Sequence, residues 1–182
     1  AAFFYGNYYF LANTILGLLG FIDDKLNLSA FFRFTCQFLL VNFLIIHSKI
    51  FNLFVIDHSL GLNIIFWLIL NLVLIGIINF INFMDGIDGL VAGCMIFVII
   101  SCSLFLGLNF IYLISSLAAF LLWNWSPSKV FMGDSGSTFL GGFVVTSILN
   151  SNSFENSALI FFTCSPLLFD SFICLLRRLF SG

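Results

Sequence analysis

Charged side chains are absent from long stretches of this chain, and this absence limits the fold more than any other feature. No Asp, Glu, Lys or Arg occurs between Gly89 and Ser128, and none occurs between Leu60 and Met84. About 20 apolar residues cross a lipid bilayer as a helix. Only 8% of the residues are charged, against roughly 25% in soluble domains. The composition therefore excludes a soluble globular domain and predicts a membrane protein.

The length needed to cross a bilayer divides the chain into about seven helices, which predicts an all-α, polytopic transmembrane bundle. Gly107-Leu108-Asn109 is the natural turn within the longest apolar stretch. The segment 137–150 is short and rich in glycine for a transmembrane helix. The predicted spans are about 2–20, 31–48, 62–82, 89–107, 109–126, 137–150 and 156–176.

Alternating crossings place the predicted loops 21–30, 83–88 and 127–136 at one face of the membrane. Every basic residue except Lys49 falls on that face, so the positive-inside rule makes it cytoplasmic in a multi-pass protein of the plasma (inner) membrane. The net charge of −2 offers no basic patch for nucleic acid. The same face receives five acidic residues, namely Asp23, Asp24, Asp85, Asp88 and Asp134. The sequence therefore predicts one polar site made by three distant segments.

The first polar segment carries two adjacent carboxylates, in GFIDDKLNL. Asp23 and Asp24 repel each other and are costly at a membrane boundary unless a cation or hydrogen-bond donors compensate them. This pair indicates a divalent metal or a proton. The alternative is a plain polar loop in which Ser29 caps the next helix.

The second polar segment, NFINFMDGIDGL, repeats a polar residue at every third position. These residues are Asn79, Asn82, Asp85 and Asp88. On a helix they form a slowly rotating stripe, while Gly86 lets the backbone approach a ligand closely. Carboxylate and amide oxygens are hard ligands that suit Mg²⁺. The alternative is a glycine-rich turn in which Asp85 or Asp88 caps the following helix.

The third polar segment, NWSPSKVFMGDSGST, surrounds one carboxylate with small residues. It precedes an apolar helix, whose free backbone N–H groups could bind an anion while Asp134 holds a metal. This combination suits a metal diphosphate. The competing interpretation makes Ser137 a simple N-cap. Lys129 could touch a phosphate or lie along the membrane interface.

In this order and on one face, the three segments resemble the polyprenyl-phosphate N-acetylhexosamine-1-phosphate transferase superfamily. Pro166, Asp170 and Arg178 in the last span fit the same resemblance, which covers essentially the whole chain. The resemblance implies transfer of a sugar-1-phosphate from a UDP-N-acetylhexosamine to undecaprenyl phosphate, with release of UMP. It also implies Mg²⁺ as the cofactor, which Mn²⁺ could replace. The expected partners are membrane lipids and a second copy of the chain in a homodimer.

The resemblance also implies roles for individual residues. Asp134 would bind Mg²⁺ together with Asn82. Asp23 and Asp24 would lie near the lipid phosphate, and these two with Asp134 form the predicted catalytic set. The predicted substrate-binding residues are Asn79, Asp85, Gly86, Asp88 and Phe131.

A phosphomonoester is already largely a dianion at neutral pH, because its second pKa is about 6. Strong base catalysis is therefore hardly required, and we favour direct attack on the β-phosphorus with Asp23 or Asp24 orienting the nucleophile. A covalent intermediate on an Asp nucleophile stays as the alternative.

The resemblance implies a parent of ten or eleven helices, so residues 1–182 would form a single transmembrane catalytic domain that is incomplete at both ends. The residues of the second and third motifs are more similar to the branch of the superfamily that catalyses the first step in the synthesis of cell-envelope polysaccharides such as lipopolysaccharide. The phospho-MurNAc-pentapeptide translocase of peptidoglycan synthesis is the nearest alternative. Rivals from other classes are a divalent-cation transporter, which the absence of an internal repeat disfavours, and a non-catalytic scaffold.

Overall fold

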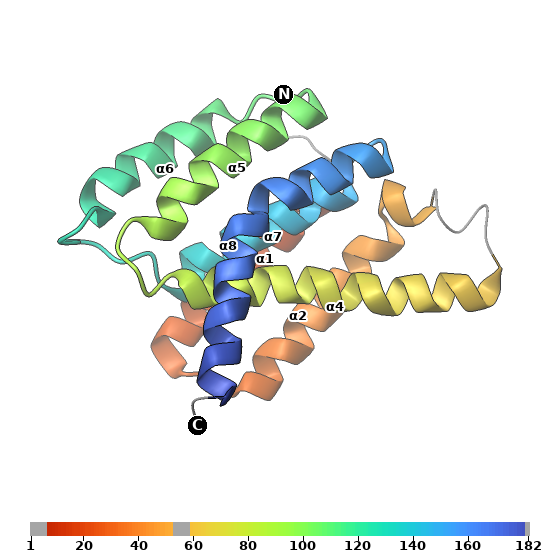
Figure 1. The fold of residues 1–182 in the computed structure, drawn as a ribbon, viewed down its shortest axis with the longest axis horizontal. Coiled ribbons are helices and arrows are strands. Elements are labelled where there is room, and N and C mark those ends of the chain that lie inside the picture. The colour runs from red at the N-terminus through yellow and green to blue at the C-terminus, as the bar shows by residue number, and fades with distance from the viewer. Residues whose placement is uncertain (1–6, 53–58, 181–182) are drawn as a thin grey trace.

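The computed structural model describes residues 7–52 and 59–180, which form helices and no strand. Figure 1 shows these helices crossing one another in a single bundle. Their bounds are α1 (Asn7–Leu26), α2 (Ala30–Ile46), α4 (Leu60–Met84), α5 (Leu90–Leu106), α6 (Ile111–Asn124), α7 (Gly133–Leu149) and α8 (Phe154–Phe180). Each of the seven predicted spans corresponds to one of these helices, so the all-α prediction is confirmed.

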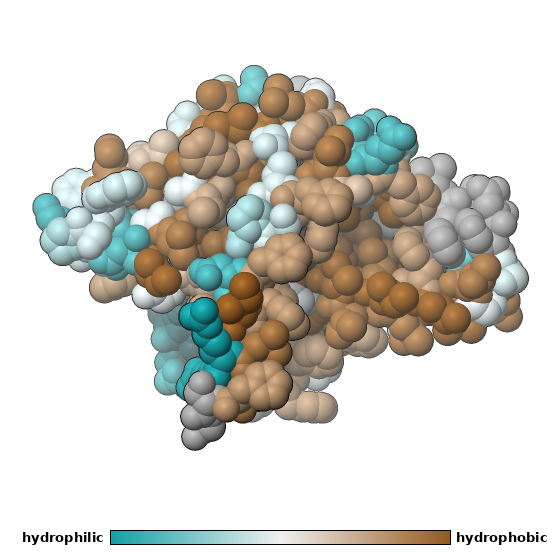
Figure 2. All heavy atoms as spheres, in the orientation of Figure 1, coloured by the Kyte–Doolittle hydropathy of each residue, from teal (hydrophilic) through white to brown (hydrophobic). Residues whose placement is uncertain are grey.

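The surface of the bundle is largely apolar. Helices α4 and α8 are long and apolar enough to cross a membrane, while α2, α5 and α6 are shorter apolar helices. Large apolar side chains cover much of the face shown in Figure 2, and Phe31 and Leu122 are each 81% exposed. An exposed apolar surface of this extent would associate in water but is suited to lipid. The chain is therefore a membrane-integral helical bundle.

Several helix ends follow the expected local chemistry. The Ser29 hydroxyl accepts a hydrogen bond from the Phe32 N–H at 3.3 Å and so caps α2. Gly107 ends α5 in the left-handed conformation, at φ 64°, which confirms the predicted turn. Gly89, at φ 72°, begins α5. The alternative that Asp85 or Asp88 caps α5 is therefore wrong, and Asp85 instead follows the end of α4.

Two of the predicted helix boundaries, those beside the carboxylates, are wrong in a way that affects the site. Helix α1 continues to Leu26, so Asp23 and Asp24 lie in its last turns and not in a loop. Helix α7 begins at Gly133 and not at 137, which places Asp134 in its first turn. Ser137 is not the N-cap, since its hydroxyl donates to the Gly133 carbonyl at 2.9 Å. The physical reason for both shifts is a contact between the two helices.

Helix α7 is the centre of the bundle. It packs most extensively against α1 and then against α4, α8 and α5, and every residue from Leu140 to Asn150 is buried. Glycine makes the close packing feasible: a Cβ atom at Gly141 would lie 2.8 Å from the Cα of Ile78 in α4. Helix α6 packs mainly on α5 (Figure 1). The polar first turn of α7 is thus held in place by the helices around it.

Candidate active site

The end of α1 meets the beginning of α7 through Asp24. One of its carboxylate oxygens accepts from the Asp134 N–H at 2.9 Å, and the other accepts from the Ser135 N–H at 3.1 Å. These are the backbone donors that a helix N-terminus leaves without a partner inside the helix. A negative charge is also favoured there by the helix dipole. Asp24 therefore caps α7 from a different helix, which explains both boundary shifts.

Side-chain hydroxyls of α7 reinforce this junction. Ser135 donates to the Gly17 carbonyl at 3.2 Å, and Thr138 donates to the Leu16 carbonyl at 3.1 Å. A Cβ atom at Gly20 would lie 2.2 Å from the Asp134 carbonyl oxygen. The two backbones therefore come as close as they do because position 20 has no side chain.

Removal of the Asp24 cap is expected to destabilise the bundle. Asp24→Ala should lower the free energy of unfolding by about 1 kcal/mol, the usual cost of a lost helix cap. Asp24→Asn should cost less, because its amide oxygen can still accept one of the two hydrogen bonds. Thermal unfolding in detergent without divalent cations measures this effect apart from any role in catalysis. An Asp24→Ala protein as stable as the wild type would refute the capping role.

Asp23 is buried at the same junction, with 5% of its surface exposed. One carboxylate oxygen accepts from the Leu28 N–H at 2.7 Å. The other forms an ion pair with the Arg33 guanidinium at 2.6 Å, and the same Arg33 nitrogen lies 3.4 Å from an Asp134 oxygen. Asp23 is thus a paired buried carboxylate, as its position at a membrane boundary requires.

Arg33 is a site residue that sequence reasoning missed. The sequence pattern indicates it only as a positive charge on the predicted cytoplasmic face. Its place one turn after the Ser29 cap, on the helix that follows the Asp pair, is the signal that could have indicated it. Among the residues that the structure describes, Arg33 makes the only ion pairs.

Asn82 brings the second polar segment to Asp134. Its amide nitrogen donates to an Asp134 oxygen at 2.9 Å and to the Ser137 hydroxyl at 2.9 Å. Asn82 lies near the end of α4 and Asp134 at the start of α7, so the pairing joins residues that are 52 positions apart. The predicted metal ligands Asn82 and Asp134 are therefore neighbours.

Asp85 follows α4 and faces the same group of acids. Burial raises the pKa of the Asp85 carboxyl to about 6, and the negative charges of Asp134 and Asp24 add to the rise. A backbone hydrogen bond from Gly133 acts in the opposite direction. We call Asp23, Asp24, Asp85 and Asp134 the carboxylate cluster.

Asp88 lies at the edge of the site and ties two loops together. Its oxygens accept from the Ser128 hydroxyl at 2.7 Å and from the Ser128 N–H at 3.1 Å. These hydrogen bonds lower the pKa of the exposed Asp88 carboxyl. The convergence of the three polar segments that the sequence predicts is therefore confirmed.

Asn124, the last residue of α6, joins the same two loops, the one before α5 and the one before α7. Its side chain is buried, accepts from the Gly89 N–H at 3.0 Å and donates to the Val130 carbonyl at 2.9 Å. Asn124→Ala leaves both backbone groups without these partners and should cost about 2 kcal/mol of unfolding free energy. Thermal unfolding measures the loss. Asn152→Ala, at an exposed position, is the control and should change stability by less than about 0.5 kcal/mol. Equal stability of the two variants would contradict the assignment.

Three predicted substrate-binding residues make no hydrogen bond to the carboxylate cluster in the described part of the chain, although Gly86 directly follows Asp85. Asn79 donates to the Gln37 side chain at 2.9 Å, one turn before Asn82 on α4. Gly86 has open space where a Cβ atom would be. Phe131 is 73% exposed. Their predicted roles require a ligand that extends beyond the cluster.

The donor chemistry of the cluster fits a hard divalent cation. The cluster has four carboxylates, and the Arg33 guanidinium pairs with only two of them, Asp23 and Asp134, so negative charge is in excess. No three Asp, Glu, His or Cys side chains in the described part of the chain are placed to hold a metal ion by themselves. A cation at Asp134 would therefore take amide, water and substrate oxygens as well, which is the mixed set that Mg²⁺ normally uses.

Comparison with known proteins agrees with this geometry. The family model described as glycosyl transferase family 4 matches residues 7–152, which include the whole carboxylate cluster. The chain belongs to this family. The resemblance inferred from the three polar segments is confirmed.

Curated relatives of this family 4 chain carry two kinds of name. A probable undecaprenyl-phosphate N-acetylglucosaminyl 1-phosphate transferase of Bacillus subtilis is 31% identical, over 91% of this chain and 50% of the relative. A phospho-N-acetylmuramoyl-pentapeptide-transferase of Kosmotoga olearia is 32% identical, over 72% of this chain and 47% of the relative. A protein of the same name from Staphylococcus saprophyticus is 33% identical, over 71% and 48%. The chain spans about half the length of the curated relatives it matches.

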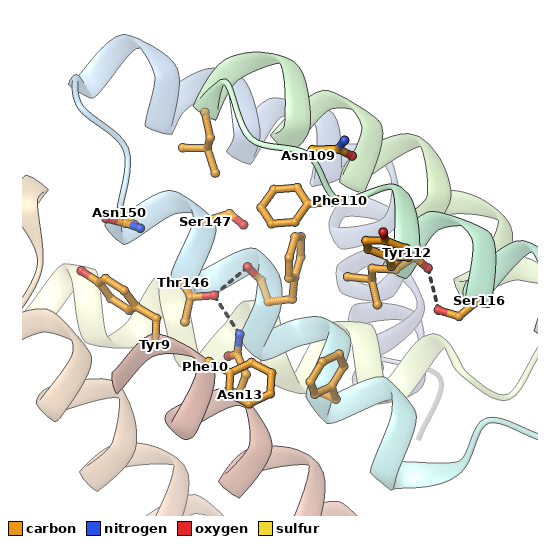
Figure 3. A pocket seen from close by; sticks show the side chains of 14 residues that line it. Tyr9, Phe10, Asn13, Asn109, Phe110, Tyr112, Ser116, Thr146, Ser147 and Asn150 are labelled. Atoms are coloured by element: carbon orange, nitrogen blue, oxygen red, sulfur yellow. Dashed lines mark hydrogen bonds between the residues drawn. The ribbon is translucent and has the colours of Figure 1, made fainter. Parts of the chain in front are cut away.

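A second feature of the chain is a cavity of about 300 Å³ between α1, α7, the first turns of α6 and the segment that joins α5 to α6 (Figure 3). In it, the Asn13 amide donates to the Thr146 hydroxyl at 3.0 Å, and the Asn13 side-chain oxygen has no hydrogen-bond partner. Thr146 lies about three turns beyond Asp134 on α7. The cavity is therefore separate from the carboxylate cluster.

Proposed function

We propose that the protein transfers N-acetylhexosamine-1-phosphate from a UDP-sugar to undecaprenyl phosphate and releases UMP. The observation that carries this proposal is the junction of α1, α4 and α7, where Asp23, Asp24, Asn82 and Asp134 lie within one hydrogen-bond network. Family membership supports transfer over divalent-cation transport and over a scaffold role. The name of the Bacillus subtilis relative supports this lipid and this class of sugar.

In this proposal Asp134 and Asn82 hold Mg²⁺. The ion would neutralise the diphosphate of the UDP-sugar and stabilise the charge that develops during phosphoryl transfer. Mn²⁺ offers the same oxygen chemistry. Asp134 is suited to this role because it is only half-buried and can meet a ligand from outside.

Asp23 and Asp24 differ in what they can contribute. Asp24 already accepts two backbone hydrogen bonds and fixes the position of Asp134. Asp23 is buried beside Arg33 and can help to orient the lipid phosphate at the junction. Direct attack by that phosphate needs no strong base, because its second pKa is about 6. Asp85, Gly86, Asp88, Asn79 and Phe131 are proposed to bind the rest of the donor.

The distribution of basic residues supports a plasma membrane protein with this site at the cytoplasmic face. Lys25, Arg33 and Lys129 lie in or beside the loops of the site, and Arg177 and Arg178 end α8. Lys49 instead lies at the other end of α2, where it binds Asn152 at 2.9 Å.

A second candidate is transfer of phospho-MurNAc-pentapeptide, as in peptidoglycan synthesis. The names of the Kosmotoga and Staphylococcus relatives favour it. The two candidates share the acceptor lipid, the metal and the released UMP. They differ in the sugar of the donor and in the pentapeptide that the second donor carries.

One assay tests both candidates. Purified full-length protein in detergent is incubated with Mg²⁺, undecaprenyl phosphate and either UDP-N-acetylglucosamine or UDP-MurNAc-pentapeptide, each labelled in the sugar. We expect label to enter the lipid and UMP to form in equal amounts with the first donor. Transfer only from the second donor would support the alternative. Folded protein that transfers label from neither donor nor any other UDP-sugar would refute the proposed function.

A further inference from the structure

Arg33 bridges two acids of the carboxylate cluster, Asp23 and Asp134. A single guanidinium nitrogen lies 2.6 Å from Asp23 and 3.4 Å from Asp134. The two acids come from α1 and α7, and Arg33 comes from α2. The positive charge of a third helix thus holds together two carboxylates that would otherwise repel each other.

The hydrogen bonds around these acids show which oxygens depend on Arg33. The second Asp23 oxygen accepts from Leu28, and the second Asp134 oxygen accepts from Asn82. The two oxygens that face Arg33 are therefore the ones whose charge it balances. The Arg33 side chain is 39% exposed, so it has room to move away when another cation arrives.

We propose that Arg33 is a positioning residue that exchanges with the divalent cation. It bridges Asp23 and Asp134 while the metal is absent, and it leaves Asp134 when the metal binds. This inference rests on the proposed function only in taking Asp134 as a metal ligand. Its consequence is that the site keeps its shape without metal, while the metal binds more weakly than the bare carboxylates alone would allow.

The first test measures Mg²⁺ binding by calorimetry on purified protein without substrates. Arg33→Gln removes the competing charge, and we expect Mg²⁺ to bind about tenfold more tightly, because a unit charge a few ångströms away acts strongly at a partly buried site. Arg33→Lys keeps the charge and should stay within about threefold of the wild type. Without metal, the Arg33→Gln protein should also unfold at a lower temperature than the wild type. Addition of Mg²⁺ should raise the unfolding temperature of Arg33→Gln more than that of the wild type.

Lys25→Gln is the matched control. It removes the same charge from the end of α1, but the Lys25 ammonium lies 4.3 Å from the centre of the Phe21 ring and makes no ion pair with the cluster. Its effect on Mg²⁺ binding should be less than about twofold, since an exposed charge is screened by solvent and salt.

The second test needs no variant and therefore does not depend on the folding of Arg33→Gln. Phenylglyoxal, which modifies accessible arginine, is applied to the wild-type protein with and without Mg²⁺, and mass spectrometry measures the extent at each position. We expect Mg²⁺ to increase modification of Arg33 and to leave the exposed Arg177 unchanged.

Two results would overturn the exchange. One is Mg²⁺ binding to Arg33→Gln that is as weak as in the wild type or weaker. The other is Arg33 modification that Mg²⁺ leaves unchanged or reduces. If the wild type binds Mg²⁺ and transfers sugar phosphate in either case, only the exchange fails. A wild-type protein that binds no Mg²⁺ either alone or in the presence of a UDP-sugar would refute both the exchange and the proposed metal site.

Discussion

Asp134→Asn is expected to reduce sugar-phosphate transfer by about 10²–10³-fold, the effect of losing one electrostatic contact to a developing charge. The substitution removes the negative charge and keeps the shape of the side chain. Its oxygen can still accept from Asn82 and its backbone N–H can still donate to Asp24, so the junction of α1 and α7 should persist. The measurement is the initial rate of UMP release with Mg²⁺ and undecaprenyl phosphate.

Glu155→Gln is the control for this prediction. Glu155 is an exposed acid in the first turn of α8, outside the carboxylate cluster. Its replacement should leave the rate within about twofold of the wild type. Thermal unfolding of both variants would establish that they are folded. A folded Asp134→Asn protein with the wild-type rate would place the reaction centre elsewhere.

Gly20→Ala should produce the largest structural effect. A Cβ atom there would lie 2.2 Å from the Asp134 carbonyl oxygen and 2.5 Å from the Thr138 hydroxyl. Helices α1 and α7 must then separate, at a cost of at least about 1–3 kcal/mol. We expect a lower midpoint of thermal unfolding and loss of transfer, because the first turn of α7 moves away from Asp24.

The matched substitution is Gly76→Ala in α4, where no atom lies within 4 Å of the new Cβ. Alanine favours a helix over glycine by about 1 kcal/mol, so this protein should unfold at the same temperature as the wild type or at a higher one. If Gly20→Ala and Gly76→Ala behaved alike, the close approach of α1 and α7 would not determine the site.

The sequence was sufficient to predict where the polar segments meet, because membrane crossings leave few arrangements for charged residues. Asp23, Asn82 and Asp134 come together as that reasoning requires. The helix ends were harder to predict. Two adjacent acids at the end of a helix oppose the helix dipole, so local rules end α1 before Asp23. The N–H groups of α7 reverse this preference, and they belong to a helix that is more than a hundred residues away.

Arg33 illustrates the same difficulty for the site. Its partners come from two other helices, so its part in the cluster depends on the rotation of α2, which an almost uniformly apolar helix does not reveal. The exposure of Phe131 and Gly86 could not be predicted from sequence patterns either, because it depends on the path of the loops. Residue types indicated the chemistry, whereas helix packing determines which side chains touch.

The cap that Asp24 places on α7 also sets an order on biosynthesis. Its backbone partners, Asp134 and Ser135, lie 110 and 111 residues later in the chain. While the ribosome is still making α2 to α6, the acids at the end of α1 have no such partner in the membrane. The candidate site can therefore be completed only after α7 has been translated and inserted, and a nascent chain that stops earlier has not formed it.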